Sequence, residues 1–156
     1  MAESTSLPIA SVQKRISAFV IDDITVALFF LIIFYDQLLV IASHASGMMS
    51  AEEMTLIQAQ LRQFSVDNIL VMLSIKVLYH TVPVWQNGIT LGKYIMKIRV
   101  IDFKTGVRPS FIQAFLRALL RIGSEVFFYL GFIMALMMPL KQTFHDKLSN
   151  CVVIDA

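Results

Sequence analysis

The first long apolar stretch in this chain is ISAFVIDDITVALFFLIIFYDQLLVI, residues 16–41, which directly follows Arg15. It is interrupted only by Asp22, Asp23 and Asp36. About 20 apolar residues cross the hydrocarbon core of a membrane as a helix, so the stretch is long enough to span. It is also longer than the apolar segment of a signal peptide, which has about 7–15 residues. The stretch therefore predicts a membrane-spanning helix.

Two further apolar regions follow. Residues 66–85 form a second predicted span, and it ends at Trp85, an aromatic residue of the kind that gathers at membrane interfaces. Residues 111–140 form a longer region. Charged residues interrupt its first half, and only 126–140 is free of them. This region predicts either one tilted span over about 119–140, or an interfacial helix followed by a re-entrant or short spanning helix.

The composition agrees with a membrane protein. Of the 156 residues, 57% are hydrophobic and 15% are charged, and the mean hydropathy is +0.72. Soluble domains carry about 45–50% apolar and about 25% charged residues. The net charge of +2 is too small to indicate a nucleic-acid partner, and a single cysteine excludes an internal disulfide framework. We expect one domain over residues 1–156, with no cofactor and no bound metal.

The connecting segments predict the orientation, because cytoplasmic loops of membrane proteins carry an excess of Lys and Arg. The tail before the first span ends in Lys14 and Arg15, whereas the 42–65 loop has only Arg62. The 86–110 loop carries Lys93, Lys97, Arg99, Lys104 and Arg108. We therefore expect the N-terminus and the 86–110 loop to be cytoplasmic, and the 42–65 loop to face outward.

Both loops contain predicted elements of their own. Ser50 and Glu53 fit a helix capping box, and apolar residues at helical spacing then predict a short amphipathic helix to Phe64. In the second loop, residues 94–100 alternate between polar and apolar side chains, which predicts a strand. The expected fold class is thus an all-α polytopic membrane protein, a small transmembrane helix bundle with a short cytoplasmic β-like element.

Charged residues inside the predicted spans need partners, because each costs at least about 2.5–3.5 kcal/mol to insert. Arg15 and Asp22 are seven residues apart and lie on nearly the same face of a helix. In the second span, Lys76 lies at about the depth of Asp22 and Asp23, and His80 follows one turn later. This geometry supports pairing of these side chains inside the bundle.

The third apolar region adds a charged face of its own. Arg117, Arg121 and Glu125 are spaced four residues apart and so lie on one side of a helix. They can join the group formed by the first two spans as a supporting charge network. A buried ion-pair network is one interpretation of the whole group, and a proton or cation relay is the other.

At four places, in the same order, the sequence resembles the RDD family of bacterial membrane proteins, named for one arginine and two aspartates. The matching stretches are RISAFVID at 15–22, GITLGK at 88–93 with IRV at 98–100, AFLR at 114–117, and TFHDKL at 143–148 with VVI at 152–154. In the family the arginine opens the first membrane helix and an aspartate lies within it. Arg15 and Asp22 match these positions, and Asp146 matches the second aspartate.

The chain departs from the family pattern at one place. The family usually has Ala-Gly-Thr after the His-Asp-x-Leu element, where this chain has Ser149-Asn150-Cys151, so we expect the local turn to differ. The resemblance implies a multi-pass protein of the bacterial inner membrane. If the terminal strand at 151–154 pairs with residues 96–101, the C-terminus is cytoplasmic, and the third region must enter and return or not cross at all. One simple third span would place it outside, and we expect the cytoplasmic tail.

Two functions remain open at this point. Because sodium/proton antiport has been attributed to some members of the family, the first hypothesis is movement of protons or monovalent cations, in a homo-oligomer within the lipid bilayer. The candidate relay is Asp22, Asp23, Lys76 and His80, with the geometry fixed by Arg15, Arg117 and Asp146. The alternative is a non-transporting scaffold or accessory subunit, in which the same charges are structural.

We expect no enzymatic activity from this sequence. The stretch GITLGK at 88–93 superficially resembles a phosphate-binding loop, but only three residues separate its glycines and Tyr94 follows the lysine, which predicts a tight glycine turn instead. Combinations of Ser, His and Asp occur without the local signature of a hydrolase. His145 and Asp146 have no further metal ligand at suitable spacing, and we expect Asp146 to meet Arg117 or Arg121.

Overall fold

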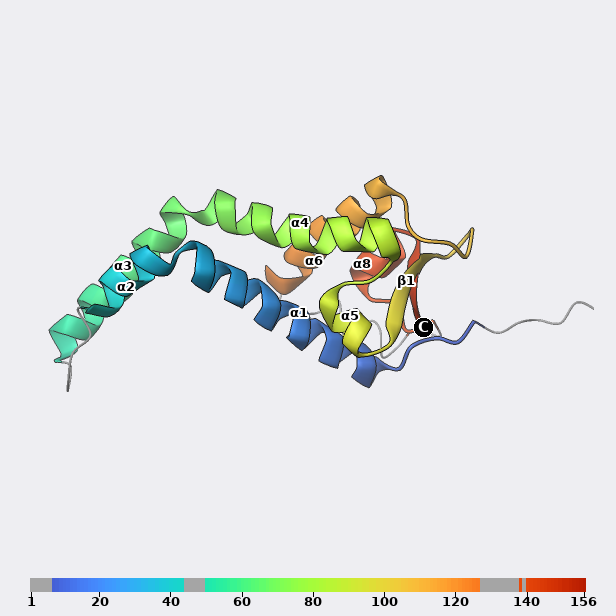
Figure 1. The fold of residues 1–156 in the computed structure, drawn as a ribbon, viewed down its shortest axis with the longest axis horizontal. Coiled ribbons are helices and arrows are strands. Elements are labelled where there is room, and N and C mark those ends of the chain that lie inside the picture. Colours follow the sequence, from blue (N-terminus) through green and yellow to red (C-terminus); the bar gives the residue numbers. More distant parts are fainter. Residues whose placement is uncertain (1–6, 44–49, 127–137, 139) are drawn as a thin grey trace, which may run out of the picture.

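The computed structural model describes residues 7–43, 50–126, 138 and 140–156. Two long helices, α1 (Val12–Ile33) and α4 (Ile69–Asn87), run side by side along the long axis of the molecule (Figure 1). Both are long and apolar enough to cross a membrane, and they are the two such helices among the described residues. At about 1.5 Å per residue, the 22 residues of α1 match the roughly 30 Å of a hydrocarbon core.

The first predicted span divides into two helices. After α1, the chain turns at Phe34, and α2 (Tyr35–Ser43) follows. Phe34 is buried and its ring packs edge-to-face on Phe64, with ring centroids 5.3 Å apart. The predicted span 16–41 therefore differs from the structure at its C-terminal end, where aromatic packing holds the turn and Asp36 lies exposed on α2.

The helix predicted from the capping box is present as α3 (Ala51–Asp67). The Ser50 hydroxyl accepts a hydrogen bond from the Glu53 backbone N–H, and the Glu53 carboxylate accepts one from the Ser50 backbone N–H. With α2, this helix extends beyond the far end of the α1–α4 pair (Figure 1). None of its residues is buried, so α2 and α3 form a projecting arm.

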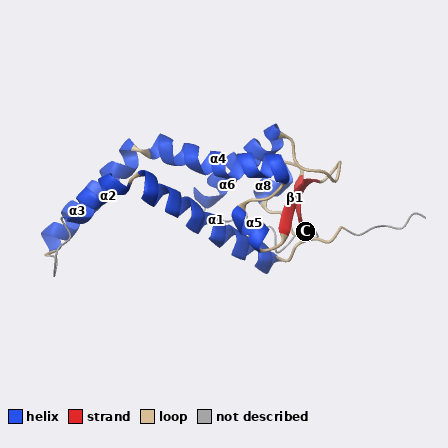
Figure 2. Ribbon diagram, viewed as in Figure 1, coloured by secondary structure: helices blue, strands red, loops and turns tan. Residues whose placement is uncertain are grey.

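The short elements gather at the opposite end (Figure 2). They are α5 (Leu91–Ile95), β1 (Ile98–Asp102), α8 (Phe144–Leu148) and β2 (Cys151–Asp155). The strands pair antiparallel, with Val100 opposite Val153. The strand predicted over 94–100 starts later than expected, because residues 94–95 belong to α5 and Lys97 has a φ of 53°, outside the extended region.

The third apolar region begins with α6 (Phe111–Val126), which packs on α4. Of the span predicted over 119–140, residues 127–137 and 139 lie outside the described part. The pairing of β1 with β2 nevertheless brings the C-terminal strand to the same end of the molecule as the segment after α4 (Figure 1). This pairing is the condition under which we expect the C-terminus on the same side as the 86–110 loop.

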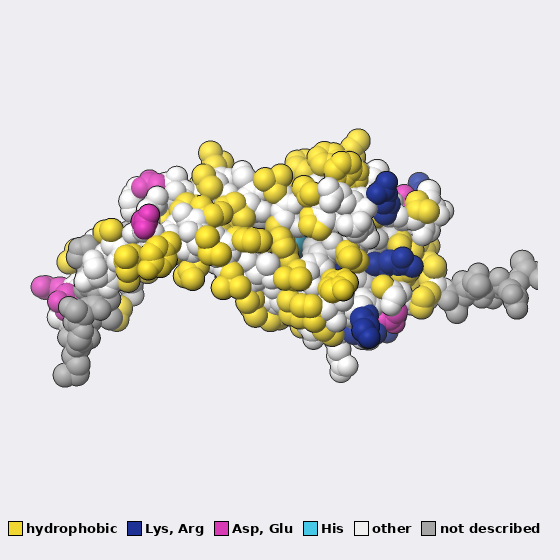
Figure 3. Space-filling view, in the orientation of Figure 1, with side chains coloured by type: hydrophobic (Ala, Val, Ile, Leu, Met, Phe, Trp, Pro, Cys, Tyr) yellow, Lys and Arg dark blue, Asp and Glu magenta, His cyan; other side chains and the backbone are white. Residues whose placement is uncertain are grey.

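The surface has the polarity of a membrane protein. Apolar side chains of α1 and α4 are exposed, among them Ile32 (70%) and Leu70 (76%), whereas Asp22 and His80 on the same helices are buried. Figure 3 shows hydrophobic atoms over the two long helices, and lysines and arginines gathered at the end that carries β1. Together these observations show a mostly helical fold with two helices suited to span a membrane and a small two-stranded sheet.

The strand pairing predicts that the single cysteine is protected. Cys151 is fully buried in the small core beneath the sheet, and burial raises the pKa of its thiol, so little reactive thiolate is accessible. We expect a maleimide reagent to label the folded protein in mild detergent far more slowly than the unfolded protein in dodecyl sulfate. A gel shift with a polyethylene-glycol maleimide measures this.

The matched control is Cys151→Ser combined with Ala156→Cys, which moves the thiol to the exposed last residue. This variant should label rapidly in mild detergent. Equal labelling rates for the parent protein and the control would contradict the paired-strand arrangement.

Candidate functional site

Asp22 lies at the centre of the polar interior. Its side chain is completely buried. Oδ1 accepts hydrogen bonds from the Tyr79 hydroxyl (2.8 Å) and the Gly92 backbone N–H (2.9 Å). Oδ2 accepts from the Thr90 hydroxyl (2.7 Å) and the Lys93 ammonium (3.2 Å). We call these five residues the Asp22 cluster. Four donors satisfy the carboxylate, so its negative charge is stabilised in the absence of water.

The GITLGK stretch supplies three of those donors because of its glycines. Gly88 ends α4 in the left-handed conformation, with a φ of 74°, and turns the chain back toward α1. Gly92 then lies directly against α1: a Cβ atom at this position would be 2.1 Å from the Ala18 carbonyl oxygen. The predicted glycine turn therefore packs directly over the buried aspartate, and we call this contact of Gly92 with α1 the clamp.

A second group of charges joins α1, α4 and α6. Arg121 contacts Asp23 (3.0 Å) and Glu125 (3.3 Å), and Lys76 pairs with the other oxygen of Glu125. We call these four residues the Glu125 cluster. Arg121 also lies 3.9 Å from Asp22 Oδ2, which links the two clusters, and its guanidinium stacks over the Phe19 ring at 4.2 Å.

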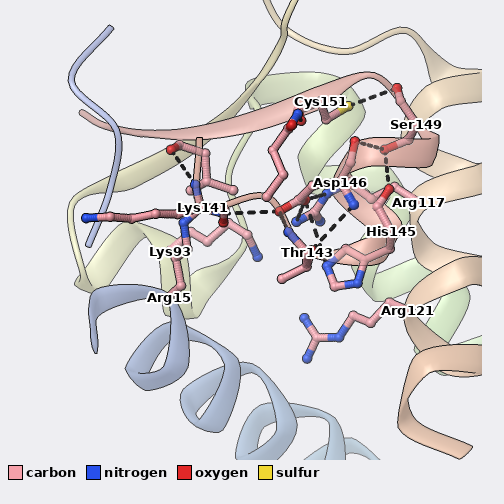
Figure 4. Close-up of polar contacts among 12 residues, drawn as sticks. Arg15, Lys93, Arg117, Arg121, Lys141, Thr143, His145, Asp146, Ser149 and Cys151 are labelled. Atoms are coloured by element: carbon pink, nitrogen blue, oxygen red, sulfur yellow. Dashed lines mark hydrogen bonds and ion pairs between the residues drawn. The ribbon is translucent and has the colours of Figure 1, made fainter. Parts of the chain in front are cut away.

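A third group connects both ends of the described chain (Figure 4). Asp146 on α8 contacts Arg117 on α6 at 2.7 Å and Arg15 on α1 at 3.2 Å. Arg15 also donates to the backbone carbonyls of Lys141 (2.6 Å) and Val153 (2.8 Å). We call Arg15, Arg117, Asp146 and the adjacent His145 the Asp146 cluster. It attaches the C-terminal segment to the first residues of α1.

Burial and neighbouring charges set the protonation of this region. Burial, opposed by Asp22, lowers the pKa of Lys93 to about 8, so this lysine can release its proton near physiological pH. Burial lowers the pKa of His145 to about 3, which keeps the imidazole neutral. Burial acts to raise the pKa of Asp146, but the two arginines Arg117 and Arg15 outweigh it and hold this pKa below its usual range.

His80, like Thr81 and Ser124, is a buried polar residue whose side chain has no hydrogen-bond partner among the described residues. It is 2% exposed, and neither of its ring nitrogens has a hydrogen-bond partner among the described residues. Its ring packs edge-to-face on Tyr79, and it interacts electrostatically with Arg121, Lys93, Arg117 and Lys76. Burying an imidazole among charged groups with neither nitrogen hydrogen-bonded costs free energy, unless a water molecule or a transferred proton satisfies a nitrogen.

The structure brings the sequence-predicted residues together, but Asp23, Lys76 and Glu125 remain partly exposed. The pairs that form also differ from those that helical spacing suggests. Lys76 pairs with Glu125 and not directly with Asp22 or Asp23. Arg15 pairs with Asp146 and not with Asp22. Although both residues lie on α1, Arg15 faces α8, whereas Asp22 faces Lys93 on α5. The expected contact of Asp146 with Arg117 is confirmed.

Sequence reasoning missed Tyr79, Thr90 and Lys93. Thr90 and Lys93 lie in the family-like stretch at 88–93, which was the available signal for them. The spacing of residues in the sequence does not show that a turn carries this stretch to α1. The described residues hold no group of three or more His, Cys, Asp or Glu side chains that could bind a metal ion. A cation at Asp22 would have to displace the donors that already fill both oxygens.

Comparison with known proteins gives one match. The family model described as "RDD family" matches residues 9–150, which is most of the chain and includes all three clusters. No curated protein and no solved structure matches.

The close approach of Gly92 to α1 predicts a sharp difference between two glycine substitutions. Gly92→Ala forces a Cβ atom against Ala18 and Asp22, so we expect a destabilised protein with a lower melting temperature in detergent. The control is Gly123→Ala on α6, where a Cβ atom meets no described atom within 4 Å and helix propensity favours alanine by about 1 kcal/mol. Equal melting temperatures for both variants would refute the clamp.

The buried imidazole of His145 predicts loss of stability in acid. In the unfolded chain it gains a proton near pH 6.5, whereas in the folded protein it stays neutral down to about pH 3. The unfolded state therefore binds more protons between these values, and the free energy of unfolding should fall as pH falls, by about 1.4 kcal/mol per unit. Below about pH 4 the low pKa of Asp146 adds to the loss.

Melting temperatures measured by Trp85 fluorescence between pH 7 and pH 4 test this. His145→Gln removes the titrating group, so its melting temperature should depend less on pH than that of the parent. An unchanged slope in this variant would assign the acid sensitivity to another group.

Proposed function

Because this chain belongs to the RDD family of membrane proteins, we propose that it moves protons across the membrane through its polar interior, in exchange for a monovalent cation. His80 is the observation that carries this proposal. Its two ring nitrogens, which have no hydrogen-bond partner in the part of the chain that the structure describes, lie inside a bundle that is otherwise rich in satisfied ion pairs. An imidazole can accept a proton at one nitrogen and release it from the other, which suits it to a relay.

The charged groups around His80 differ in exposure, which offers protons a path from partly exposed side chains to buried ones. In the Glu125 cluster the side chains of Asp23, Lys76 and Glu125 are 31%, 22% and 13% exposed, so protons can reach them from outside the core. Asp22 and Lys93 are more deeply buried, at 0% and 6% exposed. The pKa of Lys93, lowered to about 8, lets it exchange a proton at physiological pH.

The setting of this activity is part of the proposal. We propose a multi-pass protein of a bacterial inner membrane, with the N-terminus and the sheet end in the cytoplasm, because the lysines and arginines gather at that end. Two long helices enclose little space, so a conducting path would form between protomers of a homo-oligomer. The protein would transport without catalysing a chemical reaction.

A second candidate function is a non-transporting membrane scaffold or accessory subunit. The saturation of the two aspartates favours it: Asp22 accepts four hydrogen bonds, and Asp146 is held by two arginines. Charges satisfied in this way can serve only to hold helices together. The two candidates differ in whether protons cross the membrane.

Reconstituted vesicles with a pH-sensitive dye inside separate them. We expect an imposed sodium or potassium gradient to change the internal pH in vesicles that contain the parent protein, and His80→Gln to slow this change by about tenfold or more, because the amide cannot shuttle protons. Ser74→Ala, an exposed change on the same helix, is the control and should retain the parent rate.

Two outcomes would contradict the proposal. If vesicles with the parent protein change pH no faster than empty vesicles, the scaffold function is favoured. If His80→Gln is folded, as judged by its melting temperature, and exchanges at the parent rate, the relay does not use His80.

A further inference from the structure

A small cavity lies where α1, α5, α6 and α8 meet. Its volume is about 30 Å³, which is room for about two water molecules. The charged residues that line it are mostly basic: Arg15, Lys93, Arg117 and Arg121, with Asp146 as the one carboxylate. Ala18, Phe19, Ile98 and Val153 supply apolar walls. Such a lining repels cations and favours an anion.

The ion pairs leave one positive charge uncompensated. In the Asp22 and Glu125 clusters together, the three cations Lys76, Lys93 and Arg121 balance the three carboxylates Asp22, Asp23 and Glu125. The Asp146 cluster has two arginines but a single carboxylate, and its imidazole is neutral. The described interior therefore has five cations and four anions, and the excess charge of +1 lies beside the cavity.

The excess charge cannot be removed within the Asp146 cluster. Arginine keeps its proton in proteins, so neither Arg15 nor Arg117 can become neutral. Arg15 also has a buried Nε that finds no hydrogen-bond partner among the described residues. A buried net charge and an unused donor are both costly, and a negative ligand would satisfy both at once.

We propose that this cavity binds one small monovalent anion of the halide class. A monovalent anion matches the single excess charge, and the volume suits a monatomic ion better than phosphate. The apolar walls favour an ion that is weakly hydrated. This site does not depend on proton movement, because the excess charge belongs to Arg15 and Arg117, which keep their protons whether or not Lys93 releases its own.

Anion-dependent stability tests the site on the whole protein in detergent. Sodium chloride or sodium bromide, titrated against sodium gluconate at constant ionic strength, should raise the melting temperature and reach saturation, because a ligand that binds only the folded state stabilises it. Arg117→Gln brings the Asp146 cluster to zero net charge and should weaken the apparent halide affinity by about tenfold or more.

The matched control is Arg99→Gln, which makes the same change on the exposed face of β1, outside the cavity. It should keep the parent response to halide. If gluconate stabilises the parent as well as chloride does, the effect is only ionic strength and the proposal is overturned. A saturable response to phosphate without one to chloride would also overturn it, because it contradicts the size and charge of the site.

A second measurement decides the matter if Arg117→Gln does not fold. The ³⁵Cl NMR linewidth of chloride should be broadened by the parent protein, and added bromide should reverse the broadening by competition while gluconate does not. Absence of this competition would refute the site. Neither measurement involves flux, so failure of the anion site and failure of proton exchange are distinguishable.

Discussion

The hydrogen bonds that Asp22 accepts from the GITLGK turn are the interaction on which the rest of the structure depends. A fully buried carboxylate in a membrane helix is tolerable only when its oxygens are satisfied, and here a backbone N–H, two hydroxyls and an ammonium satisfy them. This requirement draws α5 onto α1, and the contact of Gly92 with Ala18 permits the approach. Because α5 leads directly into β1, the same contact positions the sheet.

The interior polarity follows from this arrangement. The long helices expose apolar side chains and turn their charges inward, so ion pairs, more than apolar packing, define which helix faces meet. The apolar core is small and lies mainly beneath the sheet. At that end Arg15 and Arg117 share Asp146, which ties the start of α1 to the C-terminal strand. A surplus of one positive charge and a buried His80 with no hydrogen-bond partner among the described residues are two features that such structural pairing leaves unexplained.

Several features could be predicted because they depend on local pattern. The apolar runs indicated the two long helices, and the Ser50–Glu53 spacing indicated α3. The charged face of α6 followed from four-residue spacing, and its contact with Asp146 was expected. The exact partners were not predictable in the same way. Lys93 lies 71 residues from Asp22, and only the turn between α4 and α5 brings it there. Depth along a helix suggested Lys76 for this role, although Glu125 is its partner.

The sequence by itself determined that this is a membrane protein of the RDD family with charge inside its helices, because composition and motif order are properties of the chain alone. Only the tertiary structure decided how those charges combine. An ion pair depends on distances of a few ångströms between side chains on different elements, and helical spacing gives the face of a residue but not the element opposite it. The close approach at Gly92 and the 30 Å³ cavity exist only once α1, α5, α6 and α8 have packed together.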